Sequence, residues 1–105
     1  MSNWIDKYHP EAKKDIDKLD GSQKIAVRKA IRKVLQNPLP QSEGGFGKPL
    51  GNKSRNNLTS LLKVKLKKEG LRIVYKVIRT ENIMYVLVVG VRSDNEVYNI
   101  AEERK

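Results

Sequence analysis

The chain has 105 residues, and 22 lysines and arginines against 12 aspartates and glutamates give it a net charge of +10. With 38% hydrophobic residues it can bury one modest core, so we expect a single domain over residues 1–105. The absence of cysteine excludes disulfides, thiol catalysis and cysteine-based zinc sites, and one histidine cannot build a histidine-rich metal site.

The excess of positive charge predicts a polyanionic partner such as nucleic acid, a ribosome or an anionic membrane surface. No stretch approaches the run of about 18 apolar residues that a membrane-spanning helix needs. The first residues also lack the basic and then apolar layout of a secretory signal peptide. We therefore expect a cytoplasmic protein.

Two helices are predicted in the first third of the chain, after a short strand over residues 4–8. The first helix begins near Pro10, because proline suits the first helical turn, and Gly21 can end it. Ser22 can cap the second helix, which stops at Asn37-Pro38. Its apolar stripe comprises Val27, Ile31, Val34 and Leu35, and its outer face carries Lys24, Arg28, Lys29, Arg32 and Lys33.

Residues 37–60 are predicted to form a long loop, since they hold three of the four prolines and four of the seven glycines. Loops of this length are uncommon in compact domains unless they are functional or mobile. Both interpretations, a functional loop and a mobile linker between the helices and the sheet, stay open at this point.

Three strands and a short helix are predicted after the loop. Residues 61–68 alternate apolar residues with lysines, residues 71–79 are rich in β-branched residues, and residues 83–91 are almost wholly apolar. A capping box of Ser93 and Glu96 predicts a C-terminal helix whose inward residues are Val97, Ile100 and Ala101. The order of elements predicts an α+β fold with helices packed on one face of a mostly antiparallel sheet.

The turns decide which side chains share a face of this sheet. A two-residue turn at Glu69-Gly70 pairs Lys67 with Arg72 and Lys63 with Lys76. A three-residue turn over residues 80–82 pairs Arg79 with Ile83 and Arg72 with Gly90, and keeps Arg92 off the core face, where an unpaired charge is costly. The predicted cationic face comprises Lys63, Lys65, Lys67, Arg72, Lys76 and Arg92, and the core face comprises Val64, Leu66, Ile73, Tyr75 and Val77.

Two interpretations of the cationic face stay open. Lysines that alternate along an exposed strand can simply protect its edge from aggregation. Alternatively, cations that repel one another on one face indicate a site for phosphates. Tyr98, near the start of the last helix, is the candidate aromatic residue on which a base would stack.

A set of short segments occurs along the chain in a characteristic order: YHPEAKKD, the helix stop NP, GKPL, LKVKL, GLRIVYKVI, VVGVR and EVY. This ordered set resembles the RelE family of toxins from type II toxin–antitoxin modules, over nearly the whole chain. The resemblance implies a fold like that of microbial ribonucleases. It also implies a ribosome-dependent endoribonuclease, which cuts mRNA in the ribosomal A site when the ribose 2′-OH attacks the adjacent phosphate.

The family's catalytic set falls on five residues of this sequence: Lys63, Lys65, Arg72, Arg92 and Tyr98. In the roles that the resemblance implies, Lys65 protonates the leaving oxygen, and Lys63 helps to activate the 2′-OH or orients the phosphate. The two arginines stabilise the transition state, and Tyr98 stacks under a base. We expect further phosphate contacts from Lys67, Lys76, Lys48 and Arg55, and we expect neither a metal nor another cofactor.

The implied partners are a cognate antitoxin, the ribosome with its mRNA, and operator DNA reached through the antitoxin complex, with no membrane partner. Two other functions stay open. The sister ParE toxins share the fold but poison DNA gyrase, and they generally lack this set of lysines, arginines and tyrosine. A non-enzymatic basic module would instead bind RNA or ribosomes through charge alone.

Overall fold

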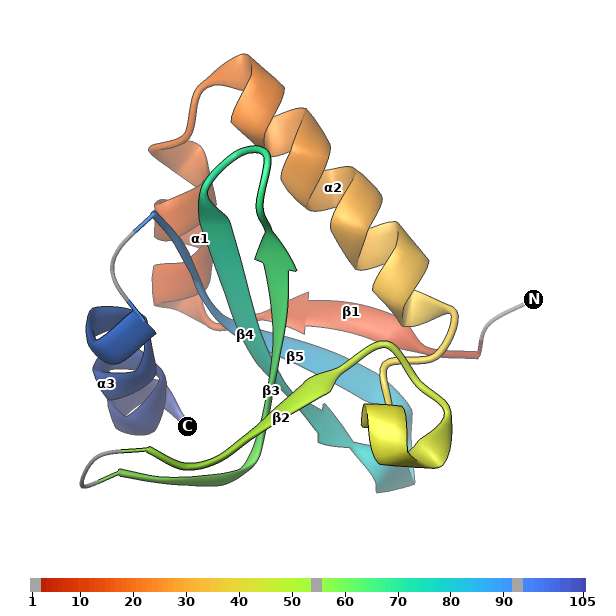
Figure 1. Ribbon diagram of the computed structural model, residues 1–105. Helices are drawn as coiled ribbons and strands as arrows, with labels where there is room; N and C mark the ends of the chain where they lie inside the picture. The colour runs from red at the N-terminus through yellow and green to blue at the C-terminus, as the bar shows by residue number, and fades with distance from the viewer. Residues whose placement is uncertain (1–2, 54–55, 92–93) are drawn as a thin grey trace.

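The computed structural model describes residues 3–53, 56–91 and 94–105, and it describes side chains in these ranges outside residues 51–60 and 94–95. Its five-stranded sheet has the order β1-β5-β4-β3-β2 (Figure 1). Strand β1 (Ile5–Tyr8) runs parallel to β5 (Ile83–Gly90), and the other neighbours are antiparallel. The remaining elements are β2 (Lys48–Lys53), β3 (Asn56–Leu66), β4 (Leu71–Ile78), α1 (Pro10–Asp17), α2 (Gly21–Leu35) and α3 (Asp94–Arg104). This arrangement confirms the predicted α+β fold.

The two N-terminal helices are capped by residues that differ in part from those predicted. The His9 side chain accepts a hydrogen bond from the Glu11 backbone N–H at 3.1 Å, just before the proline that opens α1. Helix α2 is capped by Asp20, whose carboxylate accepts from the Gln23 N–H at 2.8 Å, while the Gln23 side chain accepts from the Asp20 N–H at 3.1 Å. The prediction that Ser22 caps α2 is therefore wrong, because the capping box of Asp20 satisfies two N–H groups at once. The prediction that Gly21 ends α1 is also wrong, because α1 ends at Asp17 and Gly21 is the first residue of α2.

The segment predicted as a long loop contains a strand. Strand β2 pairs with β3 in the register Lys48↔Lys63 and Pro49↔Leu62, so β3 begins at Asn56 and not near residue 61. This pairing satisfies backbone groups that a loop would leave to solvent, and Leu50 is buried at the same place. The prediction of a loop over all of residues 37–60 is wrong for its second half.

The hairpin between β3 and β4 has a longer turn than predicted. Leu66 pairs with Leu71 and Lys65 pairs with Arg72, so residues 67–70 form the turn, with Gly70 at a φ of 69°. The predicted pairs Lys67–Arg72 and Lys63–Lys76 are wrong by two residues. Because side chains alternate with a period of two, this shift leaves every residue of β3 and β4 on its predicted face.

The register between β4 and β5 is reached by a different route from the one predicted. Ile78 pairs with Ile83 across a four-residue turn, so the predicted Arg79–Ile83 pair is wrong. A β-bulge then leaves Leu87 as an extra residue of β5, because Tyr75 pairs with Val86 while Val74 pairs with Val88. The one-residue shift restores the predicted pair of Arg72 and Gly90.

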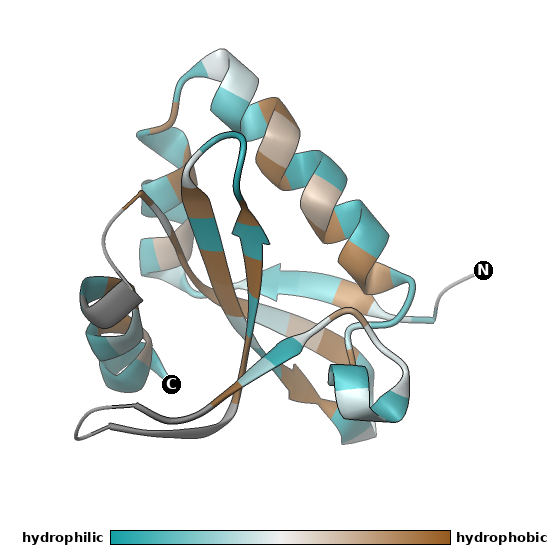
Figure 2. Cartoon of the chain, viewed as in Figure 1, coloured by the Kyte–Doolittle hydropathy of each residue, from teal (hydrophilic) through white to brown (hydrophobic). Residues whose placement is uncertain are grey.

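The sheet buries apolar side chains on both faces. Figure 2 shows that hydrophobic residues are frequent along its central strands. Under α1 and α2 lies a cluster that includes Val27, Ile31, Val34, Ile73, Tyr75 and Met84, with Val64, Leu66 and Val77 packed against it. This confirms the predicted core face. On the opposite face, α3 covers a second cluster of Leu50, Leu61, Val74, Leu87, Val88, Val97, Tyr98 and Ala101.

The position of α3 differs from the expectation that all helices share one face. The predicted inward residues are confirmed, because Val97 and Ala101 are buried and Ile100 packs against the second cluster. Yet these residues meet Val74, which lies on the same face as the lysines of β3. Helix α3 therefore packs on the predicted cationic face.

Among the described residues, no helix has the length and apolar character needed to cross a membrane.

Candidate active site

Two cations meet side by side at the hairpin end of the sheet. The β3–β4 register places Lys65 directly opposite Arg72 on the face that carries α3. Lys65 is exposed and Arg72 is half-buried, and both line a hollow of about 260 Å³ together with Lys67. An exposed ammonium beside a guanidinium fork can bind a phosphodiester and stabilise added negative charge on it.

A third cation, Lys63, is held at the edge of the α3 cluster. Its side chain is only 7% exposed, and its Nζ donates a hydrogen bond of 2.8 Å to the hydroxyl of Tyr98. The same Nζ lies 5.5 Å from the centroid of the Tyr98 ring. Burying an ammonium costs free energy unless polar groups compensate for its lost water, and the Tyr98 hydroxyl supplies such a contact. Strand β3 and helix α3 thus bring together two residues that are 35 positions apart.

The Tyr98 ring is not presented for base stacking. It is 4% exposed and belongs to the apolar cluster under α3. The stacking role expected for this ring is therefore contradicted by its burial. Its hydroxyl instead accepts the hydrogen bond from the Lys63 ammonium.

The remaining predicted cations fall into three groups. Lys48 and Lys67 lie near the site, because Lys48 pairs opposite Lys63 on β2 and Lys67 follows β3 in the turn. Lys76 lies on the same face of β4, but its Nζ turns to the ring of Tyr85 at 5.4 Å and to the C-terminal carbonyl at 3.2 Å, away from this group. Arg55 and Arg92 lie outside the described residues.

We give the name β3 hollow to a depression of about 270 Å³ lined by Gln41, Phe46, Lys48, Lys63, Val64, Lys65 and Lys67. It contains four of the predicted cations, Lys48, Lys63, Lys65 and Lys67. Phe46 and Gln41 come from the segment before β2, and sequence reasoning did not single them out. The only signal in the sequence is an aromatic residue between two glycines, which is also common in turns.

A second feature missed by sequence reasoning clamps α3 to the sheet. Arg104, in the last turn of α3, forms an ion pair of 2.8 Å with Asp15 of α1 and donates to the Leu87 carbonyl at 2.8 Å. Asp15 also accepts from the Val89 N–H at 3.3 Å. These contacts, which we call the clamp, therefore connect α3, the helix that carries Tyr98, to α1 and to β5 at its bulge. In the sequence, both residues look like ordinary surface charges.

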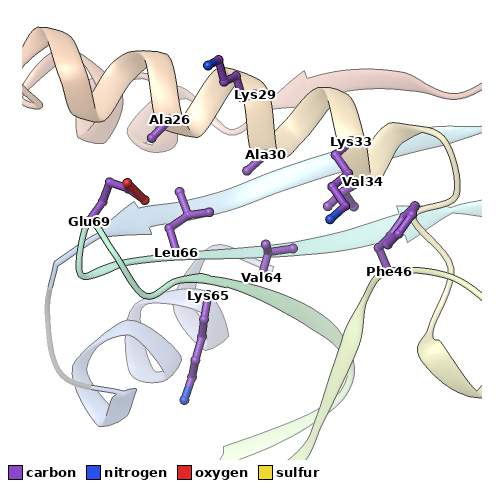
Figure 3. Close-up of a pocket in the computed structure, with 10 residues that line it drawn as sticks. All are labelled: Ala26, Lys29, Ala30, Lys33, Val34, Phe46, Val64, Lys65, Leu66 and Glu69. Carbon is purple, nitrogen blue, oxygen red and sulfur yellow. The ribbon is translucent and has the colours of Figure 1, made fainter.

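A larger hollow, with a volume of about 450 Å³, lies on the other side of β3, between the sheet and α2 (Figure 3). We call it the α2 groove. Its floor is apolar and its rim carries Lys29 and Lys33. Lys65 lines it as well, but the end of the Lys65 side chain points away from the groove. The candidate chemistry therefore lies outside this groove.

The described residues contain no cluster of three histidine, aspartate or glutamate side chains that could hold a metal ion.

Comparison with known proteins places the chain among toxins. The family described as "ParE toxin of type II toxin-antitoxin system, parDE" matches residues 7–96. A RelE-like toxin protein of Escherichia coli is 31% identical over 99 residues, which are 93% of each chain. The mRNA interferase toxin RelE of Escherichia coli strain K12 is 30% identical over 104 residues, which cover 99% of this chain and 98% of that protein.

Solved structures agree with this placement. An arginine double mutant of Escherichia coli toxin RelE in the free state has a TM-score of 0.75 and 28% identity, covering 99% of this chain and 98% of that one. The same mutant toxin in complex with a peptide of antitoxin RelB has a TM-score of 0.67 and 27% identity, covering 97% of both chains. The chain belongs to the RelE/ParE superfamily and is a RelE-like toxin of a type II toxin–antitoxin system.

Proposed function

We propose that this toxin is a ribosome-dependent endoribonuclease, an mRNA interferase that cuts mRNA in the ribosomal A site and so inhibits translation. The observation that carries the proposal is the grouping of Lys63, Lys65, Arg72 and Tyr98 around one face of the sheet. Relatives at about 30% identity over the full chain are named mRNA interferases, which supports the same activity at the level of the family.

The proposed reaction is a transesterification that needs no metal. The ribose 2′-oxygen attacks the adjacent phosphorus, the bond from phosphorus to the 5′-oxygen breaks, and the products are a 2′,3′-cyclic phosphate and a 5′-hydroxyl. Negative charge builds up on the phosphorane, and preorganised cations stabilise it. Arg72 grips two phosphate oxygens, because its guanidinium offers a planar fork of donors. Arg92 is proposed to share this role on the strength of its position in the sequence.

The two lysines are proposed to act on opposite sides of the phosphate. Lys65 is exposed, so it can reach the leaving 5′-oxygen and give it a proton. Lys63 orients the phosphate as an ammonium, which Tyr98 holds in place through the 2.8 Å hydrogen bond, and the proton of the 2′-hydroxyl leaves to solvent water. Tyr98 is therefore proposed as a positioning residue.

The proposed partners are a cognate antitoxin, the ribosome and mRNA. Escherichia coli RelE has been solved in complex with an antitoxin RelB peptide, and that chain resembles this one over 97% of its length. The net charge of +10 supports binding to an acidic protein segment and to RNA. The proposed place of action is the cytoplasm, where translating ribosomes are found.

The test is induced expression in a bacterium, with growth and mRNA 5′ ends measured by primer extension. Wild type is compared with Lys65→Ala, Arg72→Lys and the control Lys18→Ala, which changes an exposed lysine at the end of α1. We expect growth arrest and new in-frame 5′ ends for wild type and the control only. Arginine and lysine are not interchangeable in a bidentate contact, so Arg72→Lys separates catalysis from attraction by charge.

One observation favours a second candidate function, because the matching family is described by its ParE toxin. A ParE-like toxin would poison DNA gyrase and leave mRNA intact. Growth arrest that is equally strong in Lys65→Ala and Arg72→Lys, without new mRNA ends, would contradict the interferase proposal. Trapped gyrase–DNA cleavage complexes from purified components would then establish the alternative, and their absence would leave passive ribosome binding.

A further inference from the structure

The segment before β2 is a closed loop whose backbone hydrogen bonds are satisfied internally. Gln41 N–H donates to the Gly47 carbonyl at 2.8 Å, and Gly47 N–H donates to the Leu39 carbonyl at 3.1 Å. Phe46 N–H donates to the Asn37 carbonyl at 3.0 Å, directly after the end of α2. A loop whose backbone is hydrogen-bonded within itself and to the end of a helix keeps its shape without a ligand.

The same loop is fastened to the sheet at two points. The buried hydroxyl of Tyr75 donates to the Pro38 carbonyl at 2.8 Å, and burial raises the pKa of Tyr75, so the phenol stays protonated as a donor. A Cβ atom on Gly47 would collide with that hydroxyl, so glycine allows the close approach. On the outside, Arg79 donates to both carboxylate oxygens of Glu43, at 2.9 and 2.6 Å.

This rigid loop holds an aromatic side chain in solvent. Phe46 is 40% exposed, although it is the one phenylalanine of the chain and loses hydrophobic stabilisation there. Figure 3 shows its ring beside Lys33 and Val34, and the Lys33 ammonium lies 5.6 Å from the ring centroid. A preorganised, exposed aromatic residue among cations is a feature that a ligand would explain.

The surroundings of the ring indicate what that ligand is. Phe46 lines the β3 hollow with Lys48, Lys63, Lys65 and Lys67, so phosphates can be bound at the same place as an aromatic surface. Gln41 lines it too and offers an amide that can hydrogen-bond to the edge of a base. Stacking on an aromatic ring beside a basic groove is the usual way in which proteins bind single-stranded RNA.

We propose that Phe46 and Gln41 form a nucleobase subsite of this toxin, in which a base of single-stranded RNA stacks on the Phe46 ring while the neighbouring lysines bind its backbone. The proposal rests on the proposed function for the identity of the RNA, and it names the aromatic platform that the buried Tyr98 ring does not supply. The base comes either from mRNA or from ribosomal RNA, and the chemistry of the subsite is the same for both.

The test measures binding of short, fluorescently labelled RNA whose 2′-hydroxyls are methylated, so that it cannot be cleaved. Wild type is compared with Phe46→Ala, Phe46→Leu, Phe46→Trp and the control Ile25→Ala, which removes an exposed apolar side chain from the outside of α2. We expect Phe46→Ala and Phe46→Leu to weaken binding by about 5- to 150-fold, the effect of one stacked base. Phe46→Trp and the control should bind like wild type.

Two further measurements separate stacking from other causes. The dependence of binding on salt should be the same for Phe46→Ala and wild type, because no phosphate contact is lost. A series of RNAs, each lacking the base at a different position, identifies the stacked base. The RNA that lacks this base should bind wild type and Phe46→Ala equally. If Phe46→Leu binds like wild type, or if no abasic position removes the difference, the proposal is wrong. Equal thermal stability of the variants would show that folding is not the cause.

Ribosomes distinguish the two sources of the base. A Phe46→Ala defect on ribosomes without mRNA assigns the base to ribosomal RNA, and a defect only with mRNA in the A site assigns it to the substrate. The subsite and the proposed function can fail separately. If no RNA is cut under any condition but the stacking signature is present, the interferase proposal fails and the subsite remains.

Discussion

Both faces of the sheet are covered by helices, but they are built differently. The cluster under α1 and α2 is apolar, from Val27 and Ile31 on the helix to Ile73 and Tyr75 on the strand. The cluster under α3 is bordered by charge: Lys63 on one side, and the pair of Asp15 and Arg104 on the other. A buried charge costs free energy, and the one that the described residues hold is Lys63. Its place beside the α3 cluster supports the proposal that this face serves binding and chemistry, while the apolar cluster under α1 and α2 serves stability.

The largest expected effect concerns the charged face. Lys65→Ala should lower the rate of mRNA cleavage by about 10²- to 10⁴-fold, because it removes the proposed general acid. Thermal unfolding should hardly change, since Lys65 is exposed. Single-turnover cleavage on programmed ribosomes checks the rate, with Lys18→Ala as the control. A cleavage rate within threefold of wild type would remove Lys65 from the proposed mechanism.

The opposite result is expected on the apolar face. Ile73→Ala should destabilise the fold by about 2–5 kcal/mol, because it leaves a cavity in a closely packed cluster. Urea unfolding measures this loss, and the folded fraction should keep its cleavage rate. A lower rate per folded molecule, with little loss of stability, would show that the two faces are not separable.

The clamp at the end of α3 tests whether the charged face depends on that helix. Arg104→Ala leaves Asp15 and the Leu87 carbonyl without the guanidinium, so we expect a loss of about 3 kcal/mol. Hydrogen exchange should rise first in α3, and cleavage should fall because Tyr98 no longer holds Lys63. Arg104→Lys should recover part of both. Unchanged exchange in α3 would contradict the role of the clamp.

Removing both partners of the buried hydrogen bond sharpens the comparison. The double variant Lys63→Met with Tyr98→Phe should change the free energy of unfolding by only about 1 kcal/mol, since neither polar group is left buried alone. Cleavage should nevertheless be lost. Urea unfolding beside the cleavage assay checks both. A loss as large as that of Ile73→Ala would mean that the hydrogen bond is mainly structural.

The smallest effect concerns the loop that carries Phe46. The Arg79 guanidinium lowers the pKa of the exposed Glu43 carboxyl below its usual value. The pair therefore stabilises the fold above the pKa of the unfolded chain, and this contribution is lost as pH falls through the lower pKa of the folded state. Glu43→Gln should have a slightly lower melting temperature at pH 7, and the difference should vanish once the pH is below the lowered pKa of Glu43 in the folded state. A difference that persists at acid pH would rule out the ion pair as its cause.

The sequence by itself determined the helices, four of the five strands and the face on which each residue of β3 and β4 lies. These properties depend on local periodicity, and the two-residue error in the turn at residues 67–70 left the faces unchanged, because a strand repeats every two residues. The family resemblance likewise depended on residue types in order, and both the toxin family and the α+β fold are confirmed.

Only the tertiary structure decided what covers each face and which distant side chains meet. The bulge at Leu87, the pairing of β2 and the position of α3 depend on contacts between segments far apart in the chain. The buried contact of Lys63 with Tyr98, the Asp15–Arg104 clamp and the exposed ring of Phe46 follow from those contacts. Sequence periodicity describes one element at a time, so it contains no information about how two elements meet.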